Sequence, residues 1–281
     1  MSQLRVAELW IYPVKSMAGV RVTEARVTPR GFAGDRRWML VHAATRQQAT
    51  QRELPMLATL VATLRPGGLR ITAGSETLDV SEPGVEGGNR LDVGVWEGST
   101  PARDAGDSAA AWLSAQVGVP LRLVWQSEDD VRPVDPRFAA PGDAVSLSDG
   151  FPYLVVSAAS VAHVCETAGV GADARRFRPN IVVDGCRSFA EESWSGITTE
   201  GSAGRVTFAL VKPCARCVMI DNDPDRGVRQ PGVLLTLAQF HRGRGNTAGG
   251  KVYLGMNGIA RGAGTVYQGA PLTAELAREV P

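Results

Sequence analysis

The first hundred residues of the chain carry apolar side chains at every second position over short runs. In the opening run these are Leu4 and Val6 and then Leu9 and Ile11, a spacing typical of a half-buried strand. Gly and Pro residues separate this run from the similar ones that follow it. The runs that predict strands are LRVAELWIYP, VRVTEARVT, RRWMLVHA, LATLVATLRP, LRITA and RLDVGVWEG.

Three later segments change to the spacing of a helix. The segment GDSAAAWLSAQVGVP predicts one that Asp107 or Ser108 can cap and that Gly118 ends. A second helix is expected from about Ser157 to Ala168, directly after the strand PYLVVS, and GVLLTLAQFHRG predicts a short third one. Between and after these helices, FRPNIVVDG, RVTFALVKPCARCVMI and VYLGMNGIARGAGTVYQGAPL again predict strands, the second of them broken at Pro213.

Strands and helices do not alternate regularly along the chain, so the expected fold class is mainly β with some α, an α+β fold, and not a doubly wound sheet. The polar segment SEDDVRPVDPRFAAPGDAVSLSDG is rich in Pro and Asp, which indicates a domain boundary or an active-site loop. We therefore predict a β-rich domain over residues 1–125 and a second, barrel-like domain over residues 130–281. A binding cleft is expected between the two domains.

Composition narrows the functional classes. A net charge of +1 argues against a surface that binds nucleic acid or membranes through bulk electrostatics. The N-terminus lacks the basic and apolar regions of a signal peptide, and the longest apolar run is short for a membrane span and contains Ser157, Ser160 and His163. We expect a cytoplasmic enzyme whose four cysteines are free thiols.

The motif KPCARC holds two of these cysteines, Cys214 and Cys217. They could form a redox dithiol, although a strand and not a helix follows them. They could be half of a zinc site, with Cys165, Cys186 or His163 completing it, although no second close pair exists. They could also be two small buried thiols without further chemistry.

A fourth interpretation depends on the cations near the motif. Lys212 and Arg216 flank the thiols and would favour a thiolate at Cys217. A soft thiolate beside fixed cations suits a soft or high-valent metal that an anionic cofactor carries. Further side chains that could bind an anion lie at the edges of predicted strands and turns: Lys15, Ser16, Asp35, Arg36, Thr50, Arg52, Arg178 and Asn180.

Taken together, these motifs resemble the MOSC proteins with an N-terminal β-barrel domain, the group that contains the mitochondrial amidoxime-reducing component and its bacterial relatives. The matching pieces are IYPVKS, GDRRWMLV, TQRELPML, RFRPNIVVDG with ESW, KPCARCVMIDNDPDRG and YLGMNG, and they cover nearly the whole chain in the family's order. The resemblance implies an N-terminal β-barrel domain followed by a MOSC β-barrel domain.

The resemblance also implies a molybdenum cofactor, one molybdenum on a single pyranopterin dithiolene, with Cys217 as the protein ligand of the metal. Cys214 would then pack behind the ligand. At the level of the family it further carries an assignment of pyridoxal phosphate binding. The positions that match residues gripping the pterin and its phosphate are Lys15, Ser16, Arg36, Arg178, Asn180, Arg216 and Asn257.

The function that the resemblance implies is an oxidoreductase. It would reduce small N-hydroxylated substrates, such as amidoximes, hydroxylamines and N-hydroxylated base analogues, with electrons from a separate reductase or ferredoxin-like protein. No nucleic acid and no membrane is expected as a partner. Two alternatives stay open: a sulfur carrier that uses a persulfide on Cys217, and a protein that binds the cofactor without catalysis.

Overall fold

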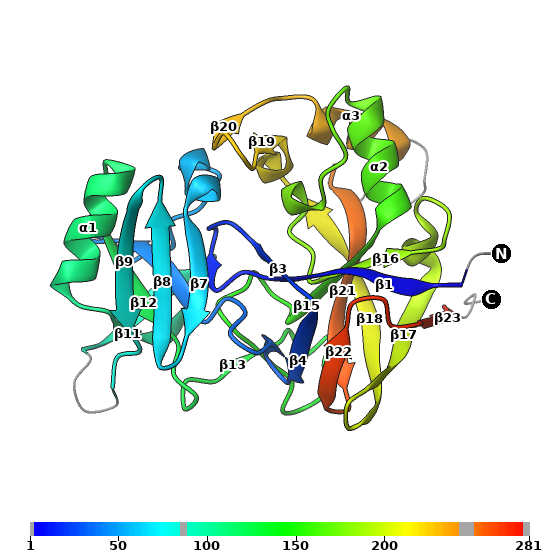
Figure 1. Ribbon diagram of the computed structural model, residues 1–281, viewed down its shortest axis with the longest axis horizontal. Coiled ribbons are helices and arrows are strands. Elements are labelled where there is room, and N and C mark those ends of the chain that lie inside the picture. Colours follow the sequence, from blue (N-terminus) through cyan, green and yellow to red (C-terminus); the bar gives the residue numbers. More distant parts are fainter. Residues whose placement is uncertain (1–2, 85–88, 242–249, 278–281) are drawn as a thin grey trace.

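The computed structural model describes residues 3–84, 89–241 and 250–277, and most of its regular structure is strand (Figure 1). The mainly β fold with a few helices that the sequence predicts is confirmed. The largest sheet has eight strands. In spatial order they are β23 (Thr273–Leu276), β17 (Trp194–Gly201), β18 (Gly204–Arg216), β21 (Val252–Arg261), β15 (Tyr153–Ser157), β16 (Ile181–Asp184), β1 (Arg5–Ile11) and β3 (Val20–Val22).

The N-terminal half is built on a five-stranded sheet and a three-stranded sheet. The larger one is ordered β10 (Arg90–Val95), β11 (Gly98–Asp104), β12 (Leu121–Trp125), β6 (Trp38–His42) and β2 (Val14–Lys15). The smaller one is ordered β7 (Val61–Arg65), β8 (Gly68–Ala73) and β9 (Glu76–Ser81). One apolar core of this half includes Trp38, Leu57 and Leu113, which are almost fully buried.

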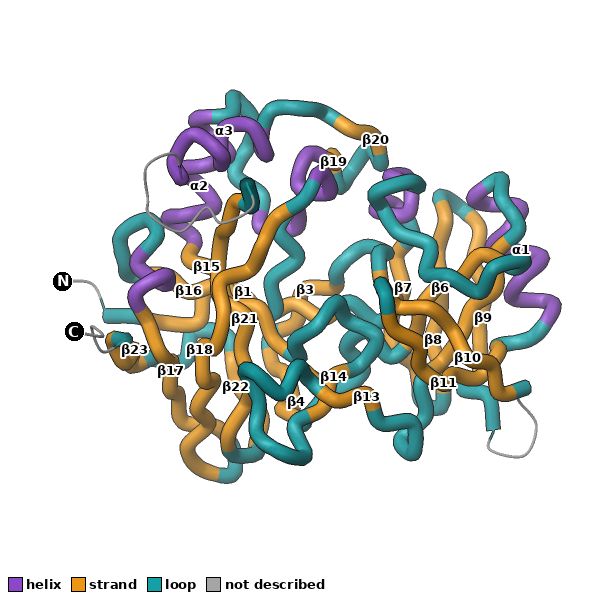
Figure 2. Tube along the Cα trace, turned by 180° about the vertical axis from the view of Figure 1, so that it is seen from behind, coloured by secondary structure: helices purple, strands orange, loops and turns teal. Residues whose placement is uncertain are grey.

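Three smaller sheets complete the described strands. They are β22 (Gly264–Tyr267) with β4 (Glu24–Thr28) and β5 (Gly31–Phe32), β13 (Arg132–Pro133) with β14 (Ala144–Val145), and β19 (Asn222–Asp223) with β20 (Val228–Arg229). Figure 2 shows β13 and β14 between the two halves. Because they lie there, the segment predicted as a boundary runs along the interface of the halves. The boundary between residues 125 and 130 itself stays a prediction.

The start of the chain does not remain with the N-terminal half. β1 pairs with β16 in antiparallel register, with Leu9 opposite Ile181, and β3 pairs with the other edge of β1. β4 pairs with β22 near the end of the described chain. β1, β3 and β4 therefore complete sheets of the C-terminal half, while β2, between β1 and β3 in the chain, pairs with β6 in the N-terminal half.

Three α-helices lie within the described residues: α1 (Asp107–Val117), α2 (Ala158–Thr167) and α3 (Val233–His241). The expected cap Ser157 of the second helix is confirmed, since its side chain accepts the N–H of Ser160. The cap expected for the first helix is wrong, because Gly106 occupies that position and Asp107 stands in the first turn. None of the helices in the described ranges has the length and apolar content to cross a membrane.

Two strand predictions need correction. Residues 57–59, the first three of the predicted strand LATLVATLRP, belong to a 3₁₀ helix, η1 (Pro55–Thr59), since Pro55 starts it without needing an N–H donor. β18 does not break at Pro213 but continues to Arg216, with irregular register against β21 on either side of the proline. The remaining 3₁₀ helices are η2 (Ala174–Arg176), η3 (Ala190–Ser193) and η4 (Val218–Asp221).

Candidate functional site

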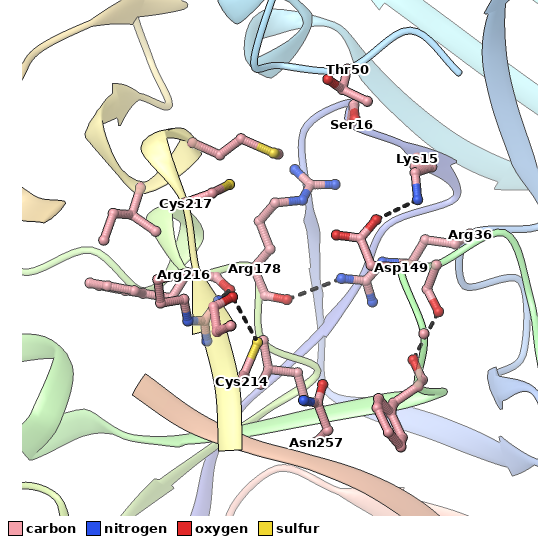
Figure 3. A pocket seen from close by; sticks show the side chains of 18 of the residues that line it. Lys15, Ser16, Arg36, Thr50, Asp149, Arg178, Cys214, Arg216, Cys217 and Asn257 are labelled. Carbon is pink, nitrogen blue, oxygen red and sulfur yellow. Dashed lines mark hydrogen bonds and ion pairs between the residues drawn. The ribbon is translucent and has the colours of Figure 1, made fainter. Parts of the chain in front are cut away.

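One pocket lies between the two halves and receives side chains from both of them (Figure 3). Figure 3 shows Lys15 and Ser16 facing it from one side and Cys217 and Asn257 from the other. The structure brings all eight predicted site residues to this pocket, and their roles there stay predictions. The eight are Lys15, Ser16, Arg36, Arg178, Asn180, Arg216, Cys217 and Asn257.

Lys15, at the end of β2, brings a buried ammonium group to the pocket. Its Nζ donates to the carbonyl oxygen of Leu147 at 3.0 Å and lies 2.5 Å from Oδ1 of Asp149. Burial lowers the pKa of Lys15, which the carboxylate of Asp149 partly offsets. The side chain of Asp149 is 64% exposed, so the partial desolvation that would raise its pKa is outweighed by Lys15, Arg52 and Trp96, and this pKa lies well below its ordinary value. Asp149 is therefore a carboxylate at neutral pH.

Two arginines form a second cationic wall around the ring of Tyr12. Arg36 donates to Oδ2 of Asp35 at 2.6 Å, to Oδ1 of Asn180 at 3.0 Å and to the carbonyl oxygen of Arg178 at 3.0 Å. The guanidinium carbons of Arg36 and Arg178 lie 4.2 and 4.3 Å from the centroid of the Tyr12 ring. Burial lowers the pKa of Arg178 to about 10, so this side chain still carries its charge at neutral pH.

Backbone strain concentrates around the pocket. Within the described ranges, six residues other than glycine have a positive φ, and four of these six line the pocket. They are Ser16 at 67°, Arg36 at 47°, Trp96 at 59° and Arg178 at 56°. A left-handed backbone at such residues costs on the order of 1–3 kcal/mol each and clusters at ligand-binding sites. The strained backbone at these four residues therefore lowers the stability of the fold while it directs their side chains into the pocket.

Cys217 begins η4 directly after β18, and its side chain is half-buried in the pocket. Nε of Arg52, from the N-terminal half, lies 3.3 Å from its Sγ. The effect expected of Lys212 and Arg216 on the charge of Cys217 stays a prediction, and no hydrogen bond joins either side chain to its Sγ among the described residues. Nζ of Lys212 lies 4.8 Å from the ring centroid of Phe138, and Arg216 donates to backbone carbonyl oxygens.

The other cysteines do not assemble around Cys217. Cys214 is half-buried in the same pocket, and burial raises its pKa although Arg216 opposes the shift. Cys165 is fully buried in an apolar core beside α2, and no disulfide joins the four cysteines. No group of three or more His, Cys, Asp or Glu side chains gathers anywhere in the described part of the chain. The described residues thus offer one thiol beside a cation and not a four-ligand zinc site.

The sequence of the chain is similar to two known domains and to several known proteins. Residues 3–120 match the MOSC N-terminal beta barrel domain, and residues 142–273 match the MOSC domain. The chain is 34% identical over 235 residues to human mitochondrial amidoxime-reducing component 1, an alignment that covers 79% of this chain and 67% of that protein. The chain belongs to the MOSC family. This MOSC protein is also 32% identical over 233 residues to the mouse protein of the same name, with 79% and 67% covered. It is 29% identical over 266 residues to zebrafish molybdenum cofactor sulfurase, covering 86% of this chain and 31% of that protein.

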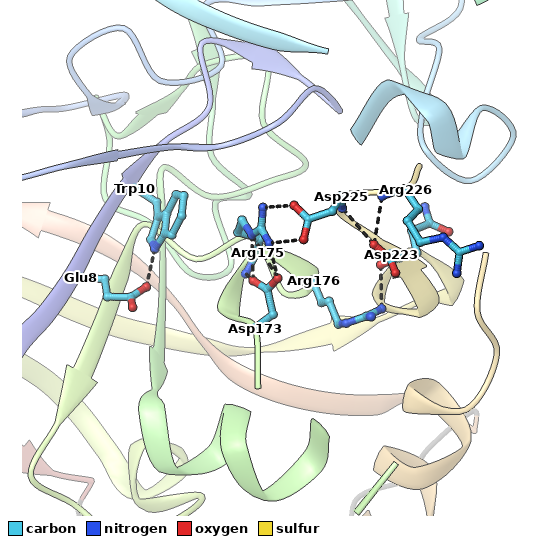
Figure 4. A network of polar contacts seen from close by, with 9 residues as sticks. Glu8, Trp10, Asp173, Arg175, Arg176, Asp223, Asp225 and Arg226 are labelled. Carbon is cyan, nitrogen blue, oxygen red and sulfur yellow. Dashed lines mark hydrogen bonds and ion pairs between the residues drawn. The ribbon is translucent and has the colours of Figure 1, made fainter. Parts of the chain in front are cut away.

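The motif DPDRG of this MOSC protein docks the Cys217 segment against both halves. Oδ1 of Asp223 accepts two backbone N–H groups of the turn, and the carboxylate of Asp225 pairs with Arg175 at 2.7 Å (Figure 4). Gly227 has a φ of 62°, and a side chain there would bring its Cβ within 2.8 Å of Cα of Met56 in η1. The motif is therefore explained by packing, since it holds η4 close to the N-terminal half.

Two pocket residues of the MOSC protein escaped sequence reasoning. Asp149 stands in a loop before β15, and Trp96 stands at the tip of the hairpin between β10 and β11. Nε1 of Trp96 donates to Oδ1 of Asp149 at 3.2 Å. Trp96 could have been recognised from the sequence, because a large aromatic residue is unusual in a two-residue hairpin turn, where small residues that tolerate a left-handed backbone are common.

Proposed function

We propose that this MOSC protein is a molybdenum-cofactor-dependent oxidoreductase that reduces small N-hydroxylated compounds, among them amidoximes, hydroxylamines and N-hydroxylated base analogues. The observation that carries the proposal is the thiol of Cys217, half-buried beside Arg52 in a pocket whose walls also hold the cations Lys15, Arg36 and Arg178. Relatives named amidoxime-reducing components support the substrate class.

The donor set fits an anionic cofactor with one soft metal. A buried ammonium and two guanidinium groups can hold a phosphate or pterin oxygen through charge-assisted hydrogen bonds. Two of the five N–H groups of Arg36 have no acceptor among the described residues, so they stay available to a ligand. Cys217 would be the thiolate ligand of molybdenum, while Ser16, Asn180, Arg216 and Asn257 would contact the pterin. When bound, the cofactor supplies the two-electron chemistry.

The reaction takes two electrons and two protons. The N–O bond breaks, one proton adds to the nitrogen to give the amine or amidine, and the other adds to the hydroxyl oxygen, which leaves as water. The residues of this chain contribute orientation and a fixed field of charge around the reacting bond. Asp149 stays ionised at neutral pH, because its pKa is lowered, so it orients Lys15 and Trp96 and does not donate protons.

In this proposal the electrons come from a separate protein, a reductase or a ferredoxin-like carrier. The proposed compartment of the reaction is the cytoplasm. Pyridoxal phosphate binding stays an untested prediction for this chain.

The test compares two cysteine variants. The protein is produced in a host that makes the cofactor, its molybdenum and pterin are quantified, and hydroxylamine reduction is measured with an artificial electron donor. Cys217→Ser replaces a soft thiolate with a hard hydroxyl, and activity is expected to be nearly abolished. Cys214→Ser is expected to keep most of it per molybdenum bound. Equal loss in both variants would instead indicate a dithiol mechanism.

A second function is favoured by one relative, which is named molybdenum cofactor sulfurase. In this alternative Cys217 takes up sulfane sulfur from a persulfide donor, forming its own persulfide and releasing the donor as a thiolate. Cyanide-labile sulfur on Cys217 without stoichiometric molybdenum would favour this sulfur carrier over the reductase.

A further inference from the structure

Arg52 is the residue of the N-terminal half that reaches the sulfur of Cys217. Beyond the contact of its Nε with Sγ at 3.3 Å, its guanidinium carbon lies 3.9 Å from the ring centroid of Trp96. Both Arg52 and Trp96 line the pocket. The guanidinium is thus held between a sulfur and an aromatic face, a position in which its plane is fixed.

The backbone that carries Arg52 is tied to both halves. The carbonyl oxygen of Arg52 accepts a hydrogen bond from Arg229, and that of the neighbouring Gln51 accepts one from Asn222 at 2.9 Å. The side chain of Gln51 donates to the carbonyl oxygen of Ser16 at 2.7 Å. Arg52 therefore cannot shift without disturbing the turn after β19 or the loop after β2.

Trp96 supports Arg52 at a cost in backbone conformation. It holds a φ of 59° at the hairpin tip, and its indole N–H donates to Asp149, the carboxylate that pairs with Lys15. Trp96 is 41% exposed at the rim of the pocket, and its strained backbone places the face of its ring against Arg52. A continuous chain of contacts thus joins Lys15, Asp149, Trp96, Arg52 and Cys217 across the two halves.

The two terminal amino groups of Arg52 have no acceptor among the residues that the structure describes. An arginine presents its donors in a fixed fork that suits oxygen acceptors. We propose that Arg52 binds the oxygen atom of the substrate beside Cys217, and that Trp96 positions Arg52 for this contact. The proposal rests on the proposed function, and it assigns the recognition of the N-hydroxyl oxygen to the N-terminal half.

The first experiment needs neither cofactor nor turnover. Cofactor-free protein is alkylated with iodoacetate, which is anionic, and with iodoacetamide, which is neutral, and the ratio of the two rates at Cys217 is measured. The same thiolate attacks both reagents, so the fraction of Cys217 that is ionised cancels from the ratio of the two rates. The ratio therefore reports how strongly the surroundings of Cys217 attract an anion. Trypsin cuts after Arg216, which places Cys214 and Cys217 on different peptides for mass spectrometry.

Removing the charge of Arg52 should lower this ratio. With a unit charge about 4 Å away, Arg52→Gln is expected to reduce it about five- to tenfold, while Arg52→Lys keeps most of it. Trp96→Ala should lie between the two, and Trp96→Phe should stay near the wild type because an aromatic face remains. Arg261→Gln is the matched control, since Arg261 is exposed and pairs with Asp143, and its ratio should not change. An unchanged ratio in Arg52→Gln would overturn the proposal.

The second experiment separates substrate binding from cofactor binding. In cofactor-loaded protein, Arg52→Gln should lower kcat/KM for hydroxylamine about ten- to hundredfold at unchanged molybdenum content. A loss of molybdenum as large as that of Arg178→Ala would make Arg52 a cofactor residue and refute the assignment. If the wild type does not reduce hydroxylamine, the proposed function fails, while the alkylation ratio still decides whether Arg52 attracts an anion to Cys217. If Arg52→Gln does not fold, Trp96→Ala gives the decision, because its ratio should still fall below that of the wild type and an unchanged ratio would overturn the proposal.

Discussion

Replacing Arg36 by Ala should destabilise the fold even without any cofactor. Asp35 is 1% exposed and its carboxylate has the guanidinium of Arg36 at 2.6 Å, so the variant leaves a buried charge without its partner. Removing one partner of such a pair costs about 3–5 kcal/mol. At about 2–4 °C per kcal/mol for a chain of this size, the melting temperature should fall by about 6–20 °C.

Arg261→Ala supplies the contrast within the same chain. Arg261 also pairs with an aspartate at 2.6 Å, Asp143, but its side chain is 46% exposed, and such pairs contribute about 0–1 kcal/mol. Its melting temperature should stay within about 4 °C of the wild type. Thermal unfolding of the cofactor-free proteins, followed by circular dichroism, measures both shifts under one condition.

A double variant tests the cause of the loss. Oδ1 of Asp35 accepts the backbone N–H of Tyr12 at 2.8 Å, and Asn at this position keeps that acceptor while it removes the negative charge. The double variant Asp35→Asn with Arg36→Ala should therefore melt above Arg36→Ala alone. The reasoning is refuted if Arg36→Ala melts like Arg261→Ala, or if the double variant recovers nothing. A confirmed loss also means that cofactor content in Arg36→Ala has to be measured per folded protein.

Three further outcomes are expected. Arg178→Ala should bind the molybdenum cofactor about ten- to hundredfold more weakly, measured as molybdenum and pterin content per folded protein, and an unchanged content would contradict its role. Because the folded pKa of Asp149 is lowered, its carboxylate adds stability above its unfolded pKa of about 3.9 and loses it as the pH falls further. Asp149→Asn should thus be less stable than the wild type at pH 7, by about 1 kcal/mol or less because the side chain is 64% exposed. This difference in stability should shrink as the pH falls below about 4, and a difference independent of pH would contradict the reasoning. Gly227→Ala should lower the melting temperature more than Gly67→Ala. Both glycines have a left-handed φ, which costs an alanine about 1–2 kcal/mol, but only at Gly227 would the new Cβ clash with neighbouring atoms. Equal losses in the two variants would contradict the contribution of the clash.

Local patterns in the sequence predicted most elements of the fold. Alternation of apolar residues located the strands, and a serine at the end of PYLVVS located the start of α2 with its cap at Ser157. The partners of the strands could not be predicted, because a period of two does not say which strand lies alongside. The pairing of β1 with β16, about 170 residues away along the chain, depends on tertiary packing.

Motifs also brought the correct residues to the pocket, but not the contacts among them. Lys212 and Arg216 are near Cys217 in sequence, yet Nζ of Lys212 lies over the ring of Phe138, and Arg216 donates to backbone carbonyl oxygens. The cation that contacts Cys217 is Arg52, 165 residues earlier in the chain. Since no local rule connects such positions, the electrostatics of the site became visible only in three dimensions.

The placement of β1 has a consequence for how the chain folds during synthesis. β1 leaves the ribosome long before its partner β16, which is made only after the whole N-terminal half has emerged. Pairings of such high contact order form slowly, so the edge of β1 that does not pair with β3 stays unpaired until late. A fragment cut at the matched MOSC domain, residues 142–273, would lack β1 and β3 and expose the edge of β16 to pairing with other chains. The matched MOSC domain thus depends on β1 and β3 to cover the edge of β16, and we expect this fragment made alone to be prone to aggregate.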